Sequence, residues 1–470
     1  MRRTRRVGRA RRRIAATAAS LCLLALAPAA CTGGGPGHAP QPTTSGGGEI
    51  VVASGLDVTG TDGVRQQLIQ QWNSTPTGKQ HPARLVELPG SADQQRSQLL
   101  GALQSGSSAY DVVNLDVTWV PEFAQAGLIS PLDRRPGLDD ADVIPSVAAT
   151  ARWKGHTYAA PFNSDVGLLY YRVDTLEDVG IDPSSYPGKA TTWTQLQSLI
   201  RAVGEAPASD RPPGYQAGWT SQLDAYEGLT VNAVEAFESK DVRLTDADGR
   251  YTATTAGLRT GLTELKTRAG NDYTLPAALS SREAQSLSDF AAGRTDFLRH
   301  WPYAYGALFQ TLDASQLAVA PLPGKAVLGG QDLAVSAGSP RARYALDLIA
   351  YLTRAESERC LLDAGFAATR KSAYTDPAVR CRLAPAAGPS VPTETHDMPR
   401  DPDGRPSYAA PILLPALTNA VQRPRTPYYG AFTQLLQSRL HDWLSNPDLT
   451  DPDQLADSLD TALAKILKGK

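Results

Sequence analysis

The chain has 470 residues, enough for more than one domain, and its 46 Lys and Arg against 48 Asp and Glu give a formal net charge of −2. Residues 1–30 hold eight arginines and no acidic residue, so their removal would lower the net charge to −10. This balance argues against nucleic acid or an anionic membrane surface as the main partner. Beyond residue 30 no run of 18 apolar residues occurs, so the sequence predicts no spanning helix there.

The first 31 residues have the order of a lipoprotein export signal. An arginine cluster at 2–13 comes first, an apolar run at 14–30 follows, and Cys31 stands directly after it. This order predicts that residues 1–30 are removed and that Cys31 carries lipid, which would hold the protein at the extracellular face of the cell membrane. An uncleaved anchor is the alternative, because Pro28 stands where such signals usually have Leu. The sequence does not decide between the general secretory and twin-arginine routes.

Residues 31–48 are rich in Gly, Pro, Ser and Thr and predict a flexible tether. From Glu49 onward, short apolar runs alternate with segments of helical periodicity. Elements are expected first at 50–53, 64–72, 84–88, 93–103, 110–115 and 122–126, and then at 168–171, 226–237, 258–267, 284–292, 295–298, 317–321, 332–336, 342–352 and 455–467. Thr192, with Gln195 three residues later, predicts the start of a further helix.

The alternation of strands and helices predicts an α/β fold built from βαβ units, with mostly parallel sheets. Residues 384–411 are rich in Pro, Asp and Gly and predict a long irregular surface segment.

Four cysteines are present, and two of them belong to the predicted export segment. Cys360 and Cys381 remain as an even pair in a compartment that permits disulfides, so the sequence predicts that they are bonded. A free buried pair and a metal site are the alternatives. Because the six histidines are scattered, without the spacing of a metal-binding pair, we expect no metal site.

Motifs of catalysis and nucleotide binding are absent from the sequence. No phosphate-binding loop of the Gly-x-x-x-x-Gly-Lys-Ser/Thr type occurs, and no Gly-x-Gly-x-x-Gly opens a helix. The nearest approach to a nucleophile elbow, at 334–338, lacks its first glycine. A pair of carboxylates for acid–base chemistry stays open, but we expect neither an enzyme nor a cofactor.

Aromatic and polar residues stand together at the ends of four predicted strands. They are Asp116 with Trp119, Asn163 with Asp165, the run 301–305 with three aromatic residues, and the run 329–332. In open α/β sheets, ligands bind beyond the carboxyl ends of strands. Sugars suit such a lining, since their C–H faces pack on aromatic rings and their hydroxyls pair with amides and carboxylates. The alternative is that these aromatic residues belong to the core or the surface.

A set of short motifs recurs in one order along the chain, at 93–100, 110–127, 158–172, 226–229, 290–293, 301–303 (Trp-Pro-Tyr), 321–324, 328–330 and 423–429. Through these motifs, and over nearly the whole mature chain, the sequence resembles the extracellular solute-binding proteins of carbohydrate ABC importers, in the maltose/trehalose-binding branch. The resemblance implies two α/β lobes joined by crossover segments, which close like a hinge on a ligand cleft. One lobe would hold residues 49–162 and 329–372, and the other residues 163–328 and 373–470.

The resemblance also implies ligand contacts. Arg96, Asp116 and Asp165 would hydrogen-bond sugar hydroxyls, with Asn163 as an additional contact. Trp301 and Tyr303 would stack on a sugar ring, Gly330 would let the backbone approach it, and Arg423 would reach in from the second lobe. Where the family often has an aromatic residue after Gly330, this chain has Gln331, which offers an amide. Glu227 is either a cleft residue or a structural cap.

The function implied is that of a monomeric, lipid-anchored receptor, without cofactor. It would deliver a disaccharide or oligosaccharide of the trehalose or maltose type to permease subunits powered by a cytoplasmic ATPase. One alternative is a secreted glycoside hydrolase, which would need a pair of carboxylates at catalytic separation. The other is a binding lipoprotein for a ligand that is not a sugar. The sequence does not give the sugar, its linkage or its length.

Overall fold

The computed structural model describes residues 44–59, 63–106, 108–133, 141–183, 192–383, 398–446, 448–449 and 451–468. The predicted export segment and the predicted lipid site at Cys31 lie outside the described residues. Within the described ranges, no helix is long and apolar enough to cross a membrane. Thr44 Oγ1 donates to the Ser339 carbonyl (2.7 Å), and Gly46 N donates to the Pro340 carbonyl (2.7 Å). The folded part therefore begins before Glu49, within the predicted tether.

The first sheet has the strand order β2-β1-β3-β11-β6. These strands are β2 (Ala83–Leu88), β1 (Ile50–Gly55), β3 (Val112–Asp116), β11 (Leu328–Val335) and β6 (Ala159–Val166). Alternate residues of β1 face opposite sides, as a strand requires. Ile50 and Val52 pack with the helices α1 (Val64–Ser74), α12 (Ala342–Leu352) and α13 (Ala355–Asp363), whereas Ala53 belongs to the cluster that includes α3 (Ala92–Gln104) and α4 (Val120–Gln125).

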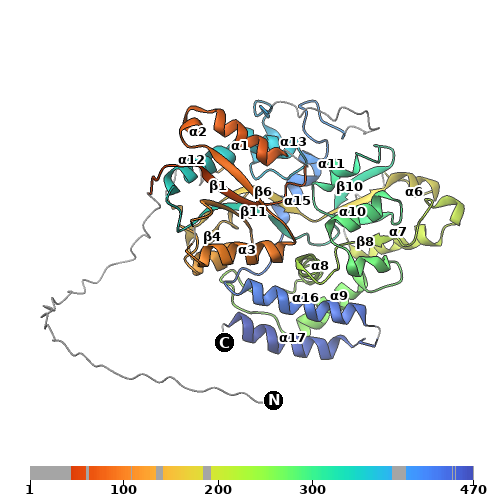
Figure 1. The fold of residues 1–470 in the computed structure, drawn as a ribbon. Coiled ribbons are helices and arrows are strands. Elements are labelled where there is room, and N and C mark those ends of the chain that lie inside the picture. The colour runs from red at the N-terminus through yellow and green to blue at the C-terminus, as the bar shows by residue number, and fades with distance from the viewer. Residues whose placement is uncertain are drawn as a thin grey trace, which may run out of the picture. The chain divides into compact units, whose positions relative to one another are not determined.

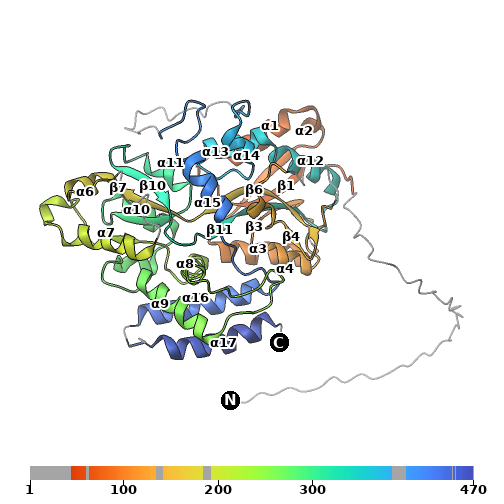
Figure 2. The ribbon, with the colours of Figure 1, turned by 180° about the vertical axis from the view of Figure 1, so that it is seen from behind.

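The second sheet has the order β10-β7-β9-β8 and is also covered on both faces. Its strands are β10 (Leu317–Pro321), β7 (Leu168–Arg172), β9 (Phe297–His300) and β8 (Trp219–Thr220). Leu168 and Tyr170 of β7 pack with α10 (Glu283–Ala291) and α11 (Ala304–Leu308), while Leu169 and Tyr171 pack with α6 (Val173–Asp178) and α7 (Trp193–Glu205). Figures 1 and 2 show this sheet and its helices beside the first.

The chain passes between the two sheets at two places that bear on the site. β6 of the first sheet continues through Gly167 into β7 of the second, and β10 returns through residues 322–327 into β11. Because returning strands enter a sheet in the reverse direction, β11 is antiparallel to β3 and β6, and β7 is antiparallel to β9 and β10. Among the strands that the structure describes, β1 pairs in parallel with β2 and β3, and β8 pairs in parallel with β9. The prediction of mostly parallel sheets is therefore wrong.

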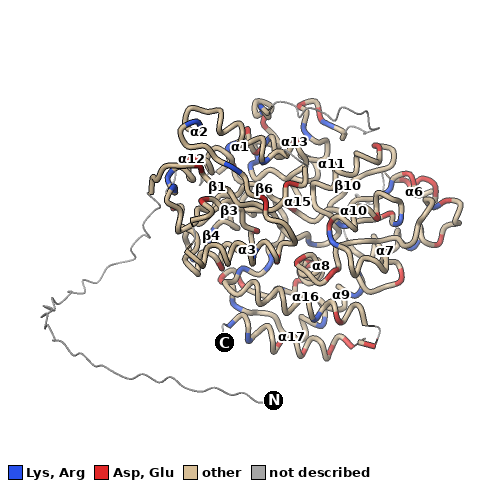
Figure 3. Tube along the Cα trace, in the orientation of Figure 1, with Lys and Arg blue, Asp and Glu red and all other residues tan. Residues whose placement is uncertain are grey.

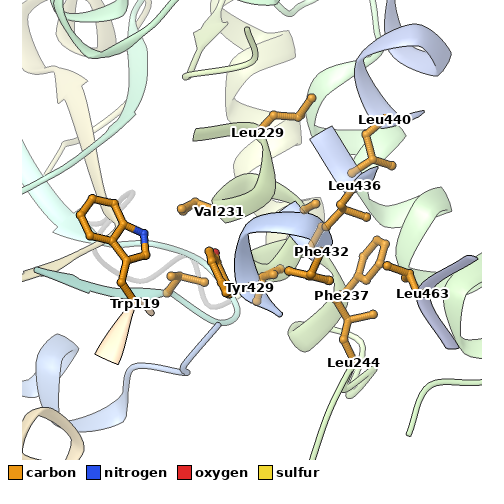
Figure 4. Close-up of a cluster of buried hydrophobic side chains, with 14 of the residues drawn as sticks. Trp119, Leu229, Val231, Phe237, Leu244, Tyr429, Phe432, Leu436, Leu440 and Leu463 are labelled. Carbon is orange, nitrogen blue, oxygen red and sulfur yellow. The ribbon is translucent and has the colours of Figure 1, made fainter. Parts of the chain in front are cut away.

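A helical layer packs beside the second sheet. It is built from α8 (Glu227–Glu238), α9 (Thr255–Ala269), α16 (Tyr429–Ser445) and α17 (Pro452–Leu467). Almost every side chain of α8 is buried, which places this helix in the interior. Figure 4 shows apolar side chains of α8, α16 and α17 directed toward one another, Phe237, Phe432, Leu436 and Leu463 among them.

The remaining elements are short. The helices are α2 (Pro76–Gln80), α5 (Pro145–Ala148), α14 (Lys371–Thr375) and α15 (Leu414–Asn419), and a small hairpin joins β4 (Arg152–Trp153) to β5 (His156–Thr157). Short 3-10 segments lie at Ala208–Asp210 and Pro276–Ser280, and a π-helical turn at Ala409–Leu413. The predicted irregular segment 384–411 therefore ends in a helical turn, and its residues 384–397 lie outside the described ranges. Lys and Arg are interspersed with Asp and Glu along the described elements (Figure 3).

The predicted disulfide between Cys360 and Cys381 is present in the structure. It joins α13 to the segment that follows α14, and it closes a loop with a sequence separation of 21.

Candidate ligand-binding site

A cavity of about 530 Å³ lies where segments from both sheets and the start of α8 meet. Seven of the predicted ligand residues line it: Asp116, Asp165, Trp301, Tyr303, Gly330, Gln331 and Arg423. They come from the end of β3, from β6 and β11, and from the segments after β9 and before α16. Residues far apart in the sequence thus converge on one space, which has the size of a small-molecule site.

Trp301 and Asp165 are neighbours on the wall of this cavity. Gly329 separates them, and a Cβ atom at that position would lie 3.2 Å from Trp301 Cζ3 and 3.1 Å from Asp165 Cβ. A larger residue would therefore displace the indole ring or the Asp165 side chain. The structure places Asn163 and Asp165 within β6, whereas the sequence placed them at the end of a strand.

The carboxylate of Asp165 is an open acceptor. Its Oδ1 is buried and has no hydrogen-bond partner among the described residues. Burial raises the pKa of Asp165 to about 7, against the opposing influence of the Arg65 guanidinium. An unpaired buried polar atom is costly, so an acceptor of this kind favours a ligand that brings a donor.

Arg65 of α1 fixes the orientation of the Gln331 amide. Arg65 Nη2 donates to Gln331 Oε1 (2.8 Å) and Asn114 Nδ2 donates to the same oxygen (2.6 Å). Because a guanidinium can only donate, the amide oxygen faces it, and the Gln331 Nε2 group keeps its N–H donors for other partners. Asn163 is buried, accepts from Arg65 Nη2 (3.0 Å), and does not line the cavity.

Arg423 joins two acidic residues across the cavity. Its Nη1 donates to Glu227 Oε1 (2.6 Å) and its Nη2 donates to Asp116 Oδ1 (2.8 Å). Glu227 also accepts from the Tyr429 hydroxyl and from Thr433 Oγ1 (2.7 Å). Burial raises the pKa of Glu227 to about 7, although Arg423 opposes the shift. Glu227 therefore lines the cavity and anchors Arg423, which favours the cleft reading, and its side chain does not cap α8.

Arg96 lies outside the cavity lining. Its Nε donates to Glu122 Oε2 (2.7 Å), its Nη2 pairs with the other carboxylate oxygen, and the guanidinium packs against Gly430. Trp119 is part of the core cluster shown in Figure 4. Tyr305 is buried against Tyr408 and Phe309. Trp119 and Tyr305 therefore belong to the core, which was the alternative to a place in the ligand site.

Comparison with known proteins identifies the kind of chain to which this cavity belongs. Residues 74–384 match the family of bacterial extracellular solute-binding proteins. The chain belongs to this family. A probable ABC transporter-binding protein of Deinococcus radiodurans is 30% identical over 304 residues, which cover 62% of this chain and 70% of that protein. This solute-binding protein is therefore a receptor and not an enzyme, which removes the glycoside hydrolase alternative.

Solved structures agree with the fold of this solute-binding protein. Maltose-bound MalE3 of T. maritima has a TM-score of 0.70 at 22% identity and covers 90% of this chain and 99% of its own. A solute-binding protein of Thermotoga lettingae bound to α-D-tagatose has a TM-score of 0.70 at 20% identity, over 89% and 99% of the two chains. The predicted α/β fold is confirmed, and it is of the periplasmic binding-protein type.

Several residues of the cavity were not predicted as ligand contacts from the sequence. They are Gln94 and Gln95 of α3, Tyr226 before α8, Arg282 and Glu283 at the start of α10, Phe366 after α13, and Arg65. Tyr226 stands inside a stretch that carries the family resemblance, which was the available signal. No signal in the sequence indicated Arg65, because its partners Asn163 and Gln331 lie 98 and 266 residues away in the sequence.

Proposed function

We propose that this receptor captures a neutral carbohydrate, a disaccharide or short oligosaccharide of the trehalose or maltose type, in the cavity around Trp301. The observation that carries the proposal is the pairing of a partly exposed indole ring with the open carboxylate of Asp165 on the two sides of Gly329. A sugar presents a C–H face and hydroxyl donors at adjacent positions, so one pyranose ring could use both groups together.

The other groups of the cavity complete the same chemistry. The Gln331 amide offers N–H donors, whereas Asp165 offers an acceptor, and a hydroxyl can serve both. Arg423 is paired with the carboxylates of Asp116 and Glu227, so these groups offer polar atoms without an unpaired cation. Tyr303 supplies a second aromatic surface. The maltose and tagatose bound to two structural relatives support a ligand of this class.

The proposal includes the setting of the receptor. Lipid on Cys31 would hold it at the outer face of the membrane, where a monomer would pass its ligand to permease subunits driven by a cytoplasmic ATPase. The lobes would be residues 49–162 with 329–372, and residues 163–328 with 373–470. A ligand that contacts both would shift the population toward a closed state, because it binds that state better.

Calorimetric titration of the purified mature chain tests the ligand class. The panel holds trehalose, maltose, maltodextrins of increasing length, glucose, mannitol and tagatose, with sn-glycerol 3-phosphate and a polyamine as ligands that are not neutral sugars. We expect saturable binding of at least one disaccharide or oligosaccharide. Binding of the phosphate ester or the polyamine alone would refute the proposal and favour the alternative of a ligand that is not a sugar.

A further inference from the structure

A buried ion pair lies directly behind Trp301. Arg299 of β9 and Glu235 of α8 have side-chain exposures of 1% and 2%. Arg299 Nε lies 3.1 Å from Glu235 Oε2, and its Nη2 lies 2.7 Å from Oε1, which is a two-pronged contact. The Arg299 guanidinium carbon is 3.9 Å from the centre of the Trp301 ring. The Arg299 guanidinium thus covers one face of the Trp301 ring, and the remaining surface of the ring is available to the cavity.

The same pair touches both passages of the chain between the sheets. At Gly167, between β6 and β7, an added Cβ would lie 2.3 Å from Glu235 Oε1 and 2.9 Å from Arg299 Nη2. At the other passage, Val327 N donates to Glu235 Oε1 (3.1 Å) just before β11 begins. Glu235 Oε1 therefore contacts Arg299 and both segments that connect the two sheets.

Net stabilisation of the fold does not explain such a pair. Removing two charges from water costs about as much as their attraction returns, so a buried ion pair is often no better than apolar side chains of the same volume. Gln222 Nε2 donates to the Arg299 carbonyl (3.0 Å), which also fixes the backbone two residues before Trp301.

We propose that the Arg299–Glu235 pair is a positioning element of the ligand site, which holds the Trp301 ring in its stacking orientation and ties it to both passages. The inference rests on the proposed function, because the ring must contact the ligand. Ligand stacking and movement of the two sheets relative to one another would then depend on the same pair, although neither residue lines the cavity.

The test compares two double variants with matched chemistry. Arg299→Met with Glu235→Leu removes the pair without leaving a lone buried charge. Arg268→Met with Glu264→Leu is the control, because Arg268 and Glu264 form a buried pair in α9 and Arg268 lies 4.9 Å from the Trp193 ring, away from the cavity. With the sugar found by calorimetry, we expect the first variant to lose about tenfold or more in affinity and the control to stay within about twofold.

A second readout does not need a ligand. All seven tryptophans lie in the described residues, and Trp301 alone is partly exposed while the other six are buried. Acrylamide quenching of tryptophan fluorescence therefore reports mainly on Trp301. We expect altered quenching in the Arg299 double variant and unchanged quenching in the control. Wild-type protein that binds no sugar would refute the proposed function, and the quenching result would still test the positioning role.

Equal loss of melting temperature in both double variants, with affinity and quenching unchanged in both, would overturn the inference. If the Arg299 double variant does not fold, Arg299→Lys replaces it, since lysine keeps the charge but cannot make the planar two-pronged contact. Unchanged affinity and quenching in that variant would overturn the inference as well.

Discussion

Asp165 of β6 places its carboxylate on the cavity wall. Its Oδ1 has no hydrogen-bond donor among the described residues. Three guanidinium groups, those of Arg65, Arg299 and Arg423, act on it at longer range and lower its pKa, while burial and Asp116 raise it. Burial dominates, and the pKa stands at about 7. A group poised at neutral pH makes ligand binding sensitive to pH.

We expect affinity for the sugar to fall by up to about tenfold between pH 8 and pH 6, because the ionised carboxylate accepts hydroxyl protons more strongly than the protonated acid and its population falls about tenfold over this range. Calorimetric titrations at these two pH values measure the change. Asp165→Asn is the control, since an amide does not titrate here, and its weaker affinity should vary much less with pH. A wild-type affinity that rises as the pH falls would contradict this role of Asp165.

Burial also raises the pKa of Asp332 in β11 to about 7, and a hydrogen bond with Thr150 opposes the shift. Thr150 has one hydroxyl proton and lies 2.7 Å from the Val147 carbonyl and 3.0 Å from Asp332 Oδ2. A protonated Asp332 can donate to Thr150 while Thr150 donates to Val147. The folded state binds the Asp332 proton more tightly than the unfolded state. The contribution of Asp332 to the free energy of unfolding is therefore fully present below about pH 4, and it is lost as the pH rises to about 7.

Asp332→Asn should therefore stabilise the protein at pH 8, by an amount on the order of a few kcal/mol, and by less at pH 5. Urea unfolding at the two pH values measures the difference. A variant that is less stable than the wild type at pH 8 would show that Arg425, which acts on Asp332, compensates the ionised carboxylate.

At the scale of single elements, the disulfide holds α13 against the segment that follows α14. Replacing both Cys360 and Cys381 by alanine should lower the free energy of unfolding by roughly 3 kcal/mol, through the greater freedom of the unfolded chain. Urea unfolding of oxidised wild type and the double variant gives this value. Neither residue lines the cavity, so sugar affinity should not change; a large loss of affinity would indicate that the loop also shapes the site.

Periodicity predicted many elements well where the pattern is local. The limits of α12 and β10 agree with those predicted, and the capping box of Thr192 and Gln195 begins α7. The extent of β6 was not predicted, because Pro161 and polar residues interrupt its apolar pattern although most of the strand is buried. α16 was also not predicted. Strand direction in the second sheet depends on the passages between sheets, which leave no local signal.

The site was predicted in part, through the family resemblance. Trp301, Asp165 and Gln331 lie together because three distant segments meet at Gly329 and Gly330. Arg96 and Asn163 carry side chains of suitable chemistry, but their partners Glu122 and Arg65 hold them away from the cavity. Which partner a polar side chain finds is decided by the tertiary fold, so the sequence could not separate these residues from those that line the cavity.

At the scale of the whole receptor, the cavity draws its walls from β3, β6 and β11 on one side and from the starts of α8 and α10 on another. The Arg423 contacts with Asp116 and Glu227, and a hydrogen bond from Glu227 N to Asp93 Oδ2 (3.2 Å), already bridge these walls. A ligand seated between them would add contacts to both, which is the condition for closure by a shift of populations.

The ligand site itself is tested most directly by titrating the sugar into Trp301→Ala and Trp193→Ala. Trp301 lines the cavity, whereas Trp193 is buried against Trp219 in the core of the second sheet. We expect Trp301→Ala to weaken binding by roughly 5- to 150-fold, from the loss of about 1–3 kcal/mol of ring contact, and Trp193→Ala to lower the melting temperature with little change in affinity. Equal affinity of Trp301→Ala and the wild type would remove this ring from the site and contradict the placement of the ligand in this cavity.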